Sequence, residues 1–400
     1  MEKAKVFDSN TYNNAKKFMS RYIQRKHLVN ILDKWSIKKT TKIMDMCEDI
    51  INAVQMTFLD IEELRFWLSK SQIDGNNLHF IYDVNFKDVN ELKLKQMLND
   101  VNKHTKNILD INEENIKGTE LIHMFKIEHK YVLSFLSPAE INIRKLTEDG
   151  IPKFRQDKIV YPAFLELDFK NNQVIVIINP TSNLVHVDGR RQGKYYSFAP
   201  IADLYLEQGR RVLGLFHVKK PQWLTNALFH LAEDLSYHNN PHVEKLGLEM
   251  ESKIKDFAKT ILEESDISDV ALIDSLSSDI QDSFISVLQE EFGEHSIDTD
   301  YRVYMQKTDQ AKHLSIEVES KKHSLVSGTI GRIAKQSRQG SDVKLLGLEV
   351  RLDTNNIYRF KIEDGEDHIL IRSSNSFTQE EVVQNVLSKL REYKNGVPHR

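Results

Sequence analysis

The apolar residues of the first seventy positions recur at the spacing of one face of an α-helix. Spacings of three and four residues separate the apolar side chains within 28–35, 43–54 and 61–68, and this period predicts three amphipathic helices. The turn between the first two helices contains Thr40 and Thr41. Because a threonine hydroxyl can accept a bond from a free helical N–H, either threonine is predicted to cap the second helix.

From residue 121 onward the period of the apolar positions changes from helical to two. Alternation of apolar and polar side chains is typical of half-buried β-strands. The strands predicted in this region cover 121–127, 131–136, 159–169, 173–178, 183–187 and 212–218. Two helices are predicted among and after them, over 199–208 and from 221 to about 237.

The last part of the chain begins with an acidic stretch at 244–293, where apolar residues return to helical spacing. Strands and two helices follow. The pattern therefore predicts an α+β fold with a helical amino-terminal region and a mainly antiparallel central sheet. The predicted domains are a basic helical region (1–117), a central α+β domain (118–243), an acidic helical connector (244–296) and a small α+β domain (297–400).

Composition supports a multidomain globular protein. The chain has 400 residues, of which 40% are hydrophobic and 28% are charged, and this length exceeds what one hydrophobic core usually serves. The single cysteine, Cys47, excludes an internal disulfide framework. A polar amino terminus and the lack of any apolar run near 20 residues lead us to expect a cytoplasmic protein without a membrane partner.

The net charge of −4 conceals a strong asymmetry along the chain. Residues 1–44 contain eleven lysines and arginines against three acids, whereas 249–300 contain fifteen acids against three lysines. Two further basic segments lie at 189–220 and 312–338. These segments could form a nucleic-acid surface, or they could be neutralised by acidic segments within the fold.

The helix pair at 27–54 encloses a basic turn that ends in Lys42. This arrangement resembles the helix–extended-turn–helix of SAP and HeH modules, although the small residue that usually precedes the Thr-Lys pair is missing. The resemblance implies that Lys38, Lys39 and Lys42 hold DNA phosphates, which suits the N–H groups and positive charge of a helix start. The alternative is an ordinary helical hairpin with a solvated basic face.

A second set of cations is interleaved with aromatic residues. It consists of Arg190, Arg191, Arg210 and Arg211, with Lys194, Tyr195 and Tyr196 between the two pairs. Mixed cations and aromatic rings are typical of proteins that bind single-stranded nucleic acid. The alternative is a pair of basic loops on a β domain.

A candidate catalytic site lies on the predicted strand that ends near Glu319. Glu319 and Lys321 stand two residues apart, which resembles the way PD-(D/E)XK nucleases present a metal-binding carboxylate and a lysine. The resemblance implies an upstream carboxylate, Asp300 or Asp309, and Mg²⁺ as the cofactor, because Mg²⁺ prefers oxygen ligands and activates water.

A possible metal site of another kind lies on the helix predicted up to about residue 237. His230, Asp234 and His238 are four residues apart and share a helix face. Such side chains can hold zinc or manganese, or they can be structural. The sequence contains no Walker phosphate loop, no dinucleotide-binding glycine motif and no G-x-S-x-G elbow.

No family is recognised across the whole chain. The basic segments favour a DNA-associated binding or assembly protein, and the composition suggests a bacterial anti-phage defence or mobile-element system. The alternatives are a metal-dependent nuclease and a purely protein–protein scaffold subunit. In each case we expect a protein partner or a homo-oligomer, with nucleic acid as the further partner of the first two.

Overall fold

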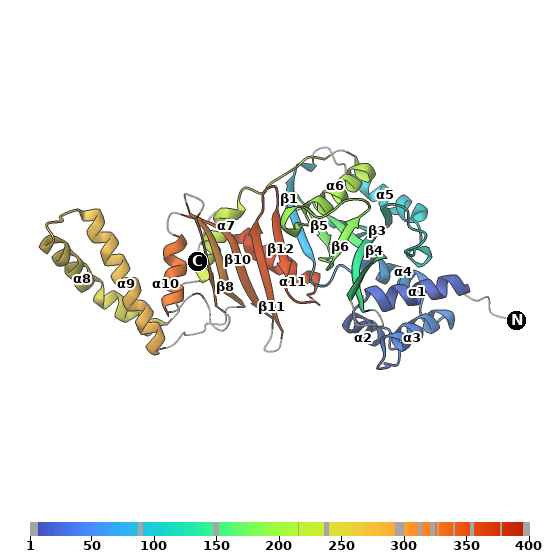
Figure 1. Cartoon of the computed structure of the whole chain (residues 1–400), viewed down its shortest axis with the longest axis horizontal. Helices are drawn as coiled ribbons and strands as arrows, with labels where there is room; N and C mark the ends of the chain where they lie inside the picture. Colours follow the sequence, from blue (N-terminus) through green and yellow to red (C-terminus); the bar gives the residue numbers. More distant parts are fainter. Residues whose placement is uncertain are drawn as a thin grey trace. The chain divides into compact units, whose positions relative to one another are not determined.

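The computed structural model of the chain forms two compact units. Unit 1 consists of Met1–Pro221 and Glu366–Val383, and unit 2 of Gln222–Gly365 and Gln384–Arg400. The structure describes residues 7–86, 91–146, 152–214, 216–235, 240–292, 300–310, 314–320, 325, 328–338, 341–352, 356–376 and 378–394. Figure 1 colours the chain along its sequence.

Unit 1 is built around an antiparallel sheet with the strand order β2-β3-β4-β5-β1-β12, and β6 and β7 pair with β3 and β1. The strands are β1 (Leu78–Val84), β2 (Glu120–Ile127), β3 (Lys130–Leu146), β4 (Pro152–Asp168), β5 (Gln173–Ile178), β6 (Leu184–Val187), β7 (Val218–Lys219) and β12 (Ile369–Ser373). The helices are α1 (Ser9–Tyr22), α2 (Arg25–Lys34), α3 (Ile43–Gln55), α4 (Ile61–Lys70), α5 (Glu91–His104) and α6 (Ala199–Leu213), with 3₁₀ turns η2 (Ile108–Asp110) and η3 (Lys194–Tyr196).

The sheet of unit 1 is covered on both faces. Every residue of β5 is buried, which is expected for a strand with helices on both sides and explains its unbroken apolar sequence. On one face α6 packs against Leu165 and its neighbours. On the other face lies the core of α1 to α4, where Leu136 and Val160 of the sheet join the helices.

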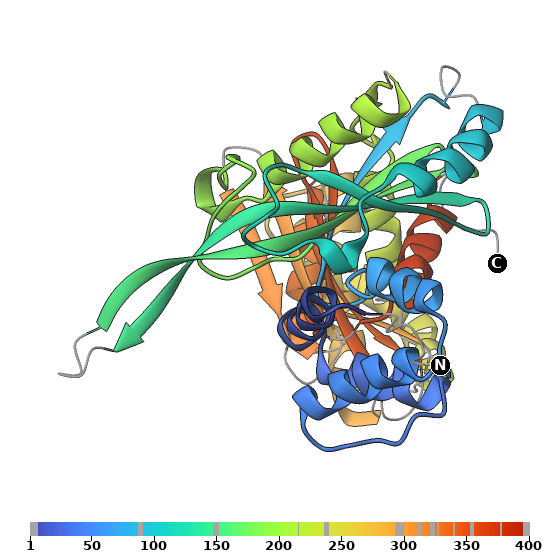
Figure 2. The same cartoon turned by 90° about the vertical axis from the view of Figure 1, so that its right-hand side faces the viewer.

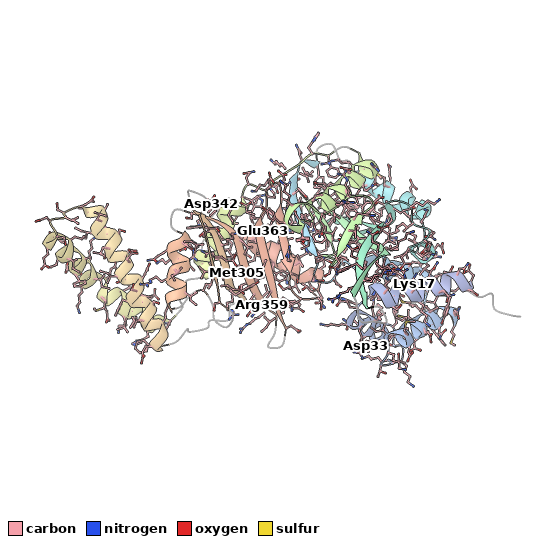
Figure 3. All side chains as sticks on the ribbon, viewed as in Figure 1. Lys17, Asp33, Met305, Asp342, Arg359 and Glu363 are labelled. Carbon is pink, nitrogen blue, oxygen red and sulfur yellow. The ribbon has the colours of Figure 1, made fainter. Side chains whose placement is uncertain are left out.

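Unit 2 contains a second antiparallel set of strands in the order β11-β10-β8-β9. Its strands are β8 (Tyr301–Gln310), β9 (Leu314–Glu319), β10 (Asp342–Arg351) and β11 (Ile357–Asp364). Its helices are α7 (Leu224–Leu235), α8 (Pro241–Glu264), α9 (Val270–Phe292) and α10 (Gly328–Arg338), and α11 (Glu380–Glu392) begins in unit 1 and ends in unit 2. Figure 3 labels Met305, Arg359 and Glu363 on this set of strands.

Helices α8 and α9 form a long antiparallel hairpin that projects from the strands of unit 2 (Figure 1). Asn240 caps α8, because its side chain accepts bonds from the backbone N–H groups of the first turn. The carboxyl-terminal half of α9 is held by α10, where Lys335 Nζ lies 2.6 Å from Asp282 and the guanidinium of Arg332 donates to Ser283 Oγ at 2.7 Å. Among the described residues, these bonds to α10 hold the hairpin near one of its ends.

A β-bulge shapes the sheet of unit 2 at Gly347. The register of β8 on β10 shifts between Gly347 and Leu348 and leaves Tyr304 as the extra residue. A Cβ atom on Gly347 would lie 2.5 Å from Met305 Cβ and 2.9 Å from Tyr304 Cζ. The missing side chain of Gly347 therefore makes room for the tyrosine ring.

Replacement of Gly347 by alanine is expected to lower the free energy of unfolding by about 1–3 kcal/mol, because the added methyl group overpacks a closed site. Chemical denaturation measures the change. Gly118→Ala is the matched control, since a Cβ there meets no atom within 4 Å. A Gly347→Ala protein as stable as the Gly118→Ala protein would contradict the packing described.

The α+β fold class predicted from the sequence is confirmed. Two local predictions are wrong. The strand expected over 212–218 is the end of α6 followed by a strand of two residues, β7, because Gly214 ends the helix at φ +96°. Lys42, not Thr40 or Thr41, is the N-cap of α3, and the Thr40 hydroxyl donates to Asp49 at 3.2 Å instead.

Candidate nucleic-acid interface

Strand β6 leads into a tight turn that fixes the start of an exposed loop. The turn residues Asp188 and Gly189 have φ values of +45° and +79°, as a two-residue Asp-Gly hairpin turn requires. Val187 and Arg190 exchange backbone hydrogen bonds of 2.9 and 2.8 Å across the turn. The Asp188 carboxylate accepts from the Thr119 N–H at 3.0 Å and hydroxyl at 2.8 Å, so the turn is tied to the body of unit 1.

The residues that follow, 190–197, form what we call the Tyr loop. Gly193 N–H donates to Ser197 O at 2.8 Å, and Ser197 N–H donates to Lys194 O at 3.2 Å. At the apex Tyr195 and Tyr196 have φ values of +56° and +59°, and their exposed fractions are 98% and 84%. Left-handed backbone costs about 1–2 kcal/mol per residue, and such strain concentrates at functional sites.

The four arginines predicted for this surface divide into two classes. Arg190 binds both carboxylate oxygens of Glu207, at 2.7 and 2.9 Å. Arg210 folds back on the chain, where its Nε donates to Phe216 O at 3.1 Å and its guanidinium lies over the Phe216 ring. Arg191 and Arg211 are exposed like Arg190, but neither is drawn into an ion pair with a described acidic residue. Arg190 and Arg210 thus stabilise the unit, while the other two arginines face solvent.

A ribbon arm adjoins the Tyr loop. Strands β3 and β4 pair along 17 residues each, from Lys130 opposite Asp168 to Leu146 opposite Pro152. Figure 2 shows this hairpin projecting well beyond the rest of the unit 1 sheet. We call 141–146 and 152–158 the ribbon arm. Most of its described side chains are exposed, and Phe154 is 71% exposed.

The base of the ribbon arm is held by α1. Arg21 donates to the Asp157 carboxylate at 3.0 Å and to Lys158 O at 3.2 Å. The other terminal nitrogen of the Arg21 guanidinium donates to the Glu113 carboxylate at 2.8 Å. The ammonium group of Lys17 (labelled in Figure 3) donates to the same carboxylate, also at 2.8 Å. Burial alone would raise the pKa of Glu113. The hydrogen bonds that its carboxylate accepts, among them those from Lys17 and Tyr22, outweigh burial, so the pKa of Glu113 is lowered. The base is therefore held by an ion network around the buried Glu113, whose partners are partly exposed.

The Tyr loop and the ribbon arm lie on the same edge of the sheet. Strand β6 pairs with β3 at Ala139, and Asp188 N–H donates to Pro138 O at 2.8 Å. From Pro138 to Arg144 is six residues along β3, which corresponds to about 20 Å of extended strand. The loop therefore stands beside the point where the arm leaves the sheet.

No family model matches this chain, and no curated protein matches it. None of the helices in the described parts of the chain is both long and apolar enough to cross a membrane.

The basic turn predicted to hold phosphates is exposed. Lys38, Lys39 and Lys42 all face solvent, although Lys39 Nζ lies 2.6 Å from the carboxylate of Asp33 (labelled in Figure 3). Lys42 has no side-chain bond to the start of α3. An anion could therefore bind Lys38 and Lys42. It could also bind the first N–H groups of α3, where the N-cap residue makes no side-chain hydrogen bond.

The residues predicted for a nuclease are not brought together. Glu319 is exposed and stands opposite Met305, whereas Asp309 stands opposite Ser315. The four residue steps from Ser315 to Glu319 correspond to about 13 Å. Asp300 lies five residues from Met305 in the other direction, and Lys321 lies outside the described residues. This geometry gives a shared metal ion no support.

The histidine cluster has structural partners where it is described. Asp234 accepts from the Tyr393 hydroxyl at 2.5 Å, and the His230 ring packs edge-on against Phe229. His238 lies outside the described residues. Within the described ranges, no group of three His, Cys, Asp or Glu side chains could hold a metal. Cys47 is fully buried, and burial raises the pKa of its thiol to about 11.

One perturbed carboxyl group was not predicted from the sequence. Glu166 is buried in unit 1, 2.7 Å from Lys130 Nζ. Burial raises its pKa to about 7 although Lys130 opposes the shift. Neither side chain of this pair reaches solvent appreciably, so the pair is an internal ion pair and not part of the exposed edge.

Proposed function

We propose that this protein binds DNA through the Tyr loop at the edge of unit 1. The observation that carries the proposal is the pair of tyrosines, Tyr195 and Tyr196, almost fully exposed in a strained left-handed conformation. Exposed rings stack on unpaired bases, and each stacked base contributes about 1–3 kcal/mol. The fold gains nothing from two unburied rings, so a ligand accounts for them better than stability does.

The charge around the tyrosines supports an anionic ligand. Arg191 and Lys194 flank the rings, and both are exposed. Cations beside a stacking platform neutralise the phosphates of the strand whose bases stack. The turn at Lys38 and Lys42 provides a further anion-binding region in the same unit.

The test is binding of a fluorescent oligothymidine as a function of salt. Affinity is expected to fall steeply between about 50 mM and 200 mM salt, because each phosphate contact releases counterions. Replacing Arg191 and Lys194 by glutamate is expected to weaken binding and flatten the salt dependence, and Lys38→Glu with Lys42→Glu to do so to a smaller extent. Lys245→Glu, at an exposed position of α8, is the control. If the parent protein ignores DNA at low salt, the proposal fails.

A protein-binding role is the second candidate, and the α8–α9 hairpin favours it. At the far end of the hairpin Phe257, Ile261, Val270 and Leu272 are between 39% and 68% exposed. Grouped exposed apolar side chains mark protein contacts. Since the surrounding segment is acidic, we propose a partner that presents a basic amphipathic helix, because charge complementarity excludes a second acidic hairpin.

A synthetic lysine- and leucine-rich helical peptide tests this second candidate. Its binding is expected to be lost in a Phe257→Ser, Leu272→Ser protein and to fall with salt. A matched peptide with glutamate in place of lysine is expected not to bind. Equal binding of both peptides would remove the argument from charge.

A further inference from the structure

One face of the ribbon arm carries a particular set of exposed side chains. Asn142 stands opposite Gln156, and Arg144 stands opposite Phe154. Residues directly opposite each other in an antiparallel pair project to the same face, as do residues two apart on one strand. All four side chains therefore share one face, and all four are exposed.

These four side chains have the chemistry that recognises base edges. Arginine donates two parallel bonds to guanine, asparagine and glutamine form paired bonds with adenine, and phenylalanine contacts the methyl group of thymine. A surface selected only for solubility would instead carry lysine and glutamate. The opposite face of the arm differs, because it exposes Lys153 and Arg155, which suit phosphates.

The dimensions of the arm fit one feature of duplex DNA. The major groove is about 12 Å wide and admits a two-stranded β-ribbon, whereas the minor groove is about half as wide. The positions from Asn142 to Arg144 span about 7 Å along the strand. This length matches two to three base pairs, at about 3.4 Å of rise per base pair.

We propose that the ribbon arm enters the major groove of duplex DNA with Asn142, Arg144, Phe154 and Gln156 toward the base edges. Lys153 and Arg155 then face the phosphates of the groove wall. The inference rests on the proposed DNA-binding function and assigns it a duplex substrate, next to the Tyr loop that takes unpaired bases. The anchoring of Asp157 and Lys158 by Arg21 holds the arm in a fixed direction, which lowers the entropic cost of insertion.

The test compares a short duplex with an oligothymidine on the full-length protein by fluorescence anisotropy. Arg144→Ala and Phe154→Ala are each expected to weaken duplex binding by about ten- to hundredfold, in line with the usual loss of a base contact, and to leave oligothymidine binding unchanged. Ile127→Ala, at an apolar position that is 45% exposed at the end of β2, is the control. Since all the substituted side chains are exposed, the circular dichroism spectrum and melting temperature are expected to stay those of the parent.

A second measurement identifies the groove. Duplexes in which 7-deazaguanine and 7-deazaadenine remove the N7 acceptors of the major groove are expected to bind more weakly, whereas a minor-groove ligand such as netropsin is expected not to compete. Duplex binding that is unaffected by both arm variants and by the deaza bases overturns the inference while the Tyr loop function stands. Absence of binding to either DNA overturns both.

Discussion

Replacing Tyr195 and Tyr196 together by glycine is expected to weaken oligothymidine binding by about a hundredfold or more, because each lost stacking contact costs about 1–3 kcal/mol. The free energy of unfolding is expected not to fall. Relief of left-handed strain, about 1–2 kcal/mol per residue, offsets the entropic cost of glycine, about 0.5–1 kcal/mol. Anisotropy and chemical denaturation measure the two effects separately.

Phenylalanine at both positions is the matched control for this variant. It keeps the rings and the strain and removes only the hydroxyl groups, so affinity is expected to stay within about twofold of the parent, since stacking depends on the ring face. A glycine variant that binds as tightly as the parent would show that the rings contact no base.

Removal of the Arg338 side chain is expected to have the largest effect on stability. Arg338 is 1% exposed, and its guanidinium donates to Glu233 at 2.5 Å and to the buried Gln306 Oε1 at 2.6 Å. Arg338→Ala leaves a cavity and takes the partner from the buried Gln306, whereas Glu233 is 39% exposed and can be hydrated, so the expected loss is about 2–4 kcal/mol. Thermal and urea denaturation of the whole protein measure the loss.

Lys335 on the same helix provides the comparison. Its side chain is 43% exposed and pairs with Asp282, so Lys335→Ala is expected to cost less than about 1 kcal/mol. If Arg338→Ala and Lys335→Ala lowered the free energy of unfolding by similar amounts, burial would not be what makes the Arg338 side chain the more stabilising of the two.

The spacing of apolar residues is sufficient to predict those helices and strands whose buried positions recur at a regular period. The helices α2, α3 and α4 were predicted because each buries one stripe of apolar residues at helical spacing. Strand β5 was predicted from its unbroken apolar run. In these segments the side chains that face the core are set by the period alone.

The ribbon arm could not be predicted in full, because its outer part buries little. The strand predicted over 159–169 begins where the core begins, whereas the strand predicted over 131–136 stops short of the buried Ala139. The paired residues farther out, at 141–146 and 152–158, are mostly exposed. The alternation of Ile141 and Ile143 with polar residues was the available signal. In this outer part, backbone hydrogen bonds continue the pairing of β3 with β4 although few side chains are buried there.

Charge runs were ambiguous for a different physical reason. In the basic segment at 312–338, the described cations Arg338 and Lys335 pair with acids inside unit 2, Arg338 with Glu233 and Lys335 with Asp282. Neither partner is near in sequence. The Tyr loop was different, because its cations and rings are consecutive and their exposure depends only on local turns. The sequence is therefore sufficient to predict an exposed loop with cations and aromatic rings. It is not sufficient to predict the distant acidic residues that neutralise the other cations.

The pairing of β1 with β12 has a consequence for synthesis of the chain on the ribosome. Leu78–Ile81 of β1 pair with β5 on one side and with β12 on the other. At about 5–20 residues per second, the interval between emergence of Ile178 and of Ser373 is on the order of 10–40 s. Throughout this interval one edge of β1 has no β12 to pair with, and an open strand edge invites pairing with other nascent chains. Slow translation or a chaperone that covers β1 would therefore change the yield of folded protein without any change in its final stability.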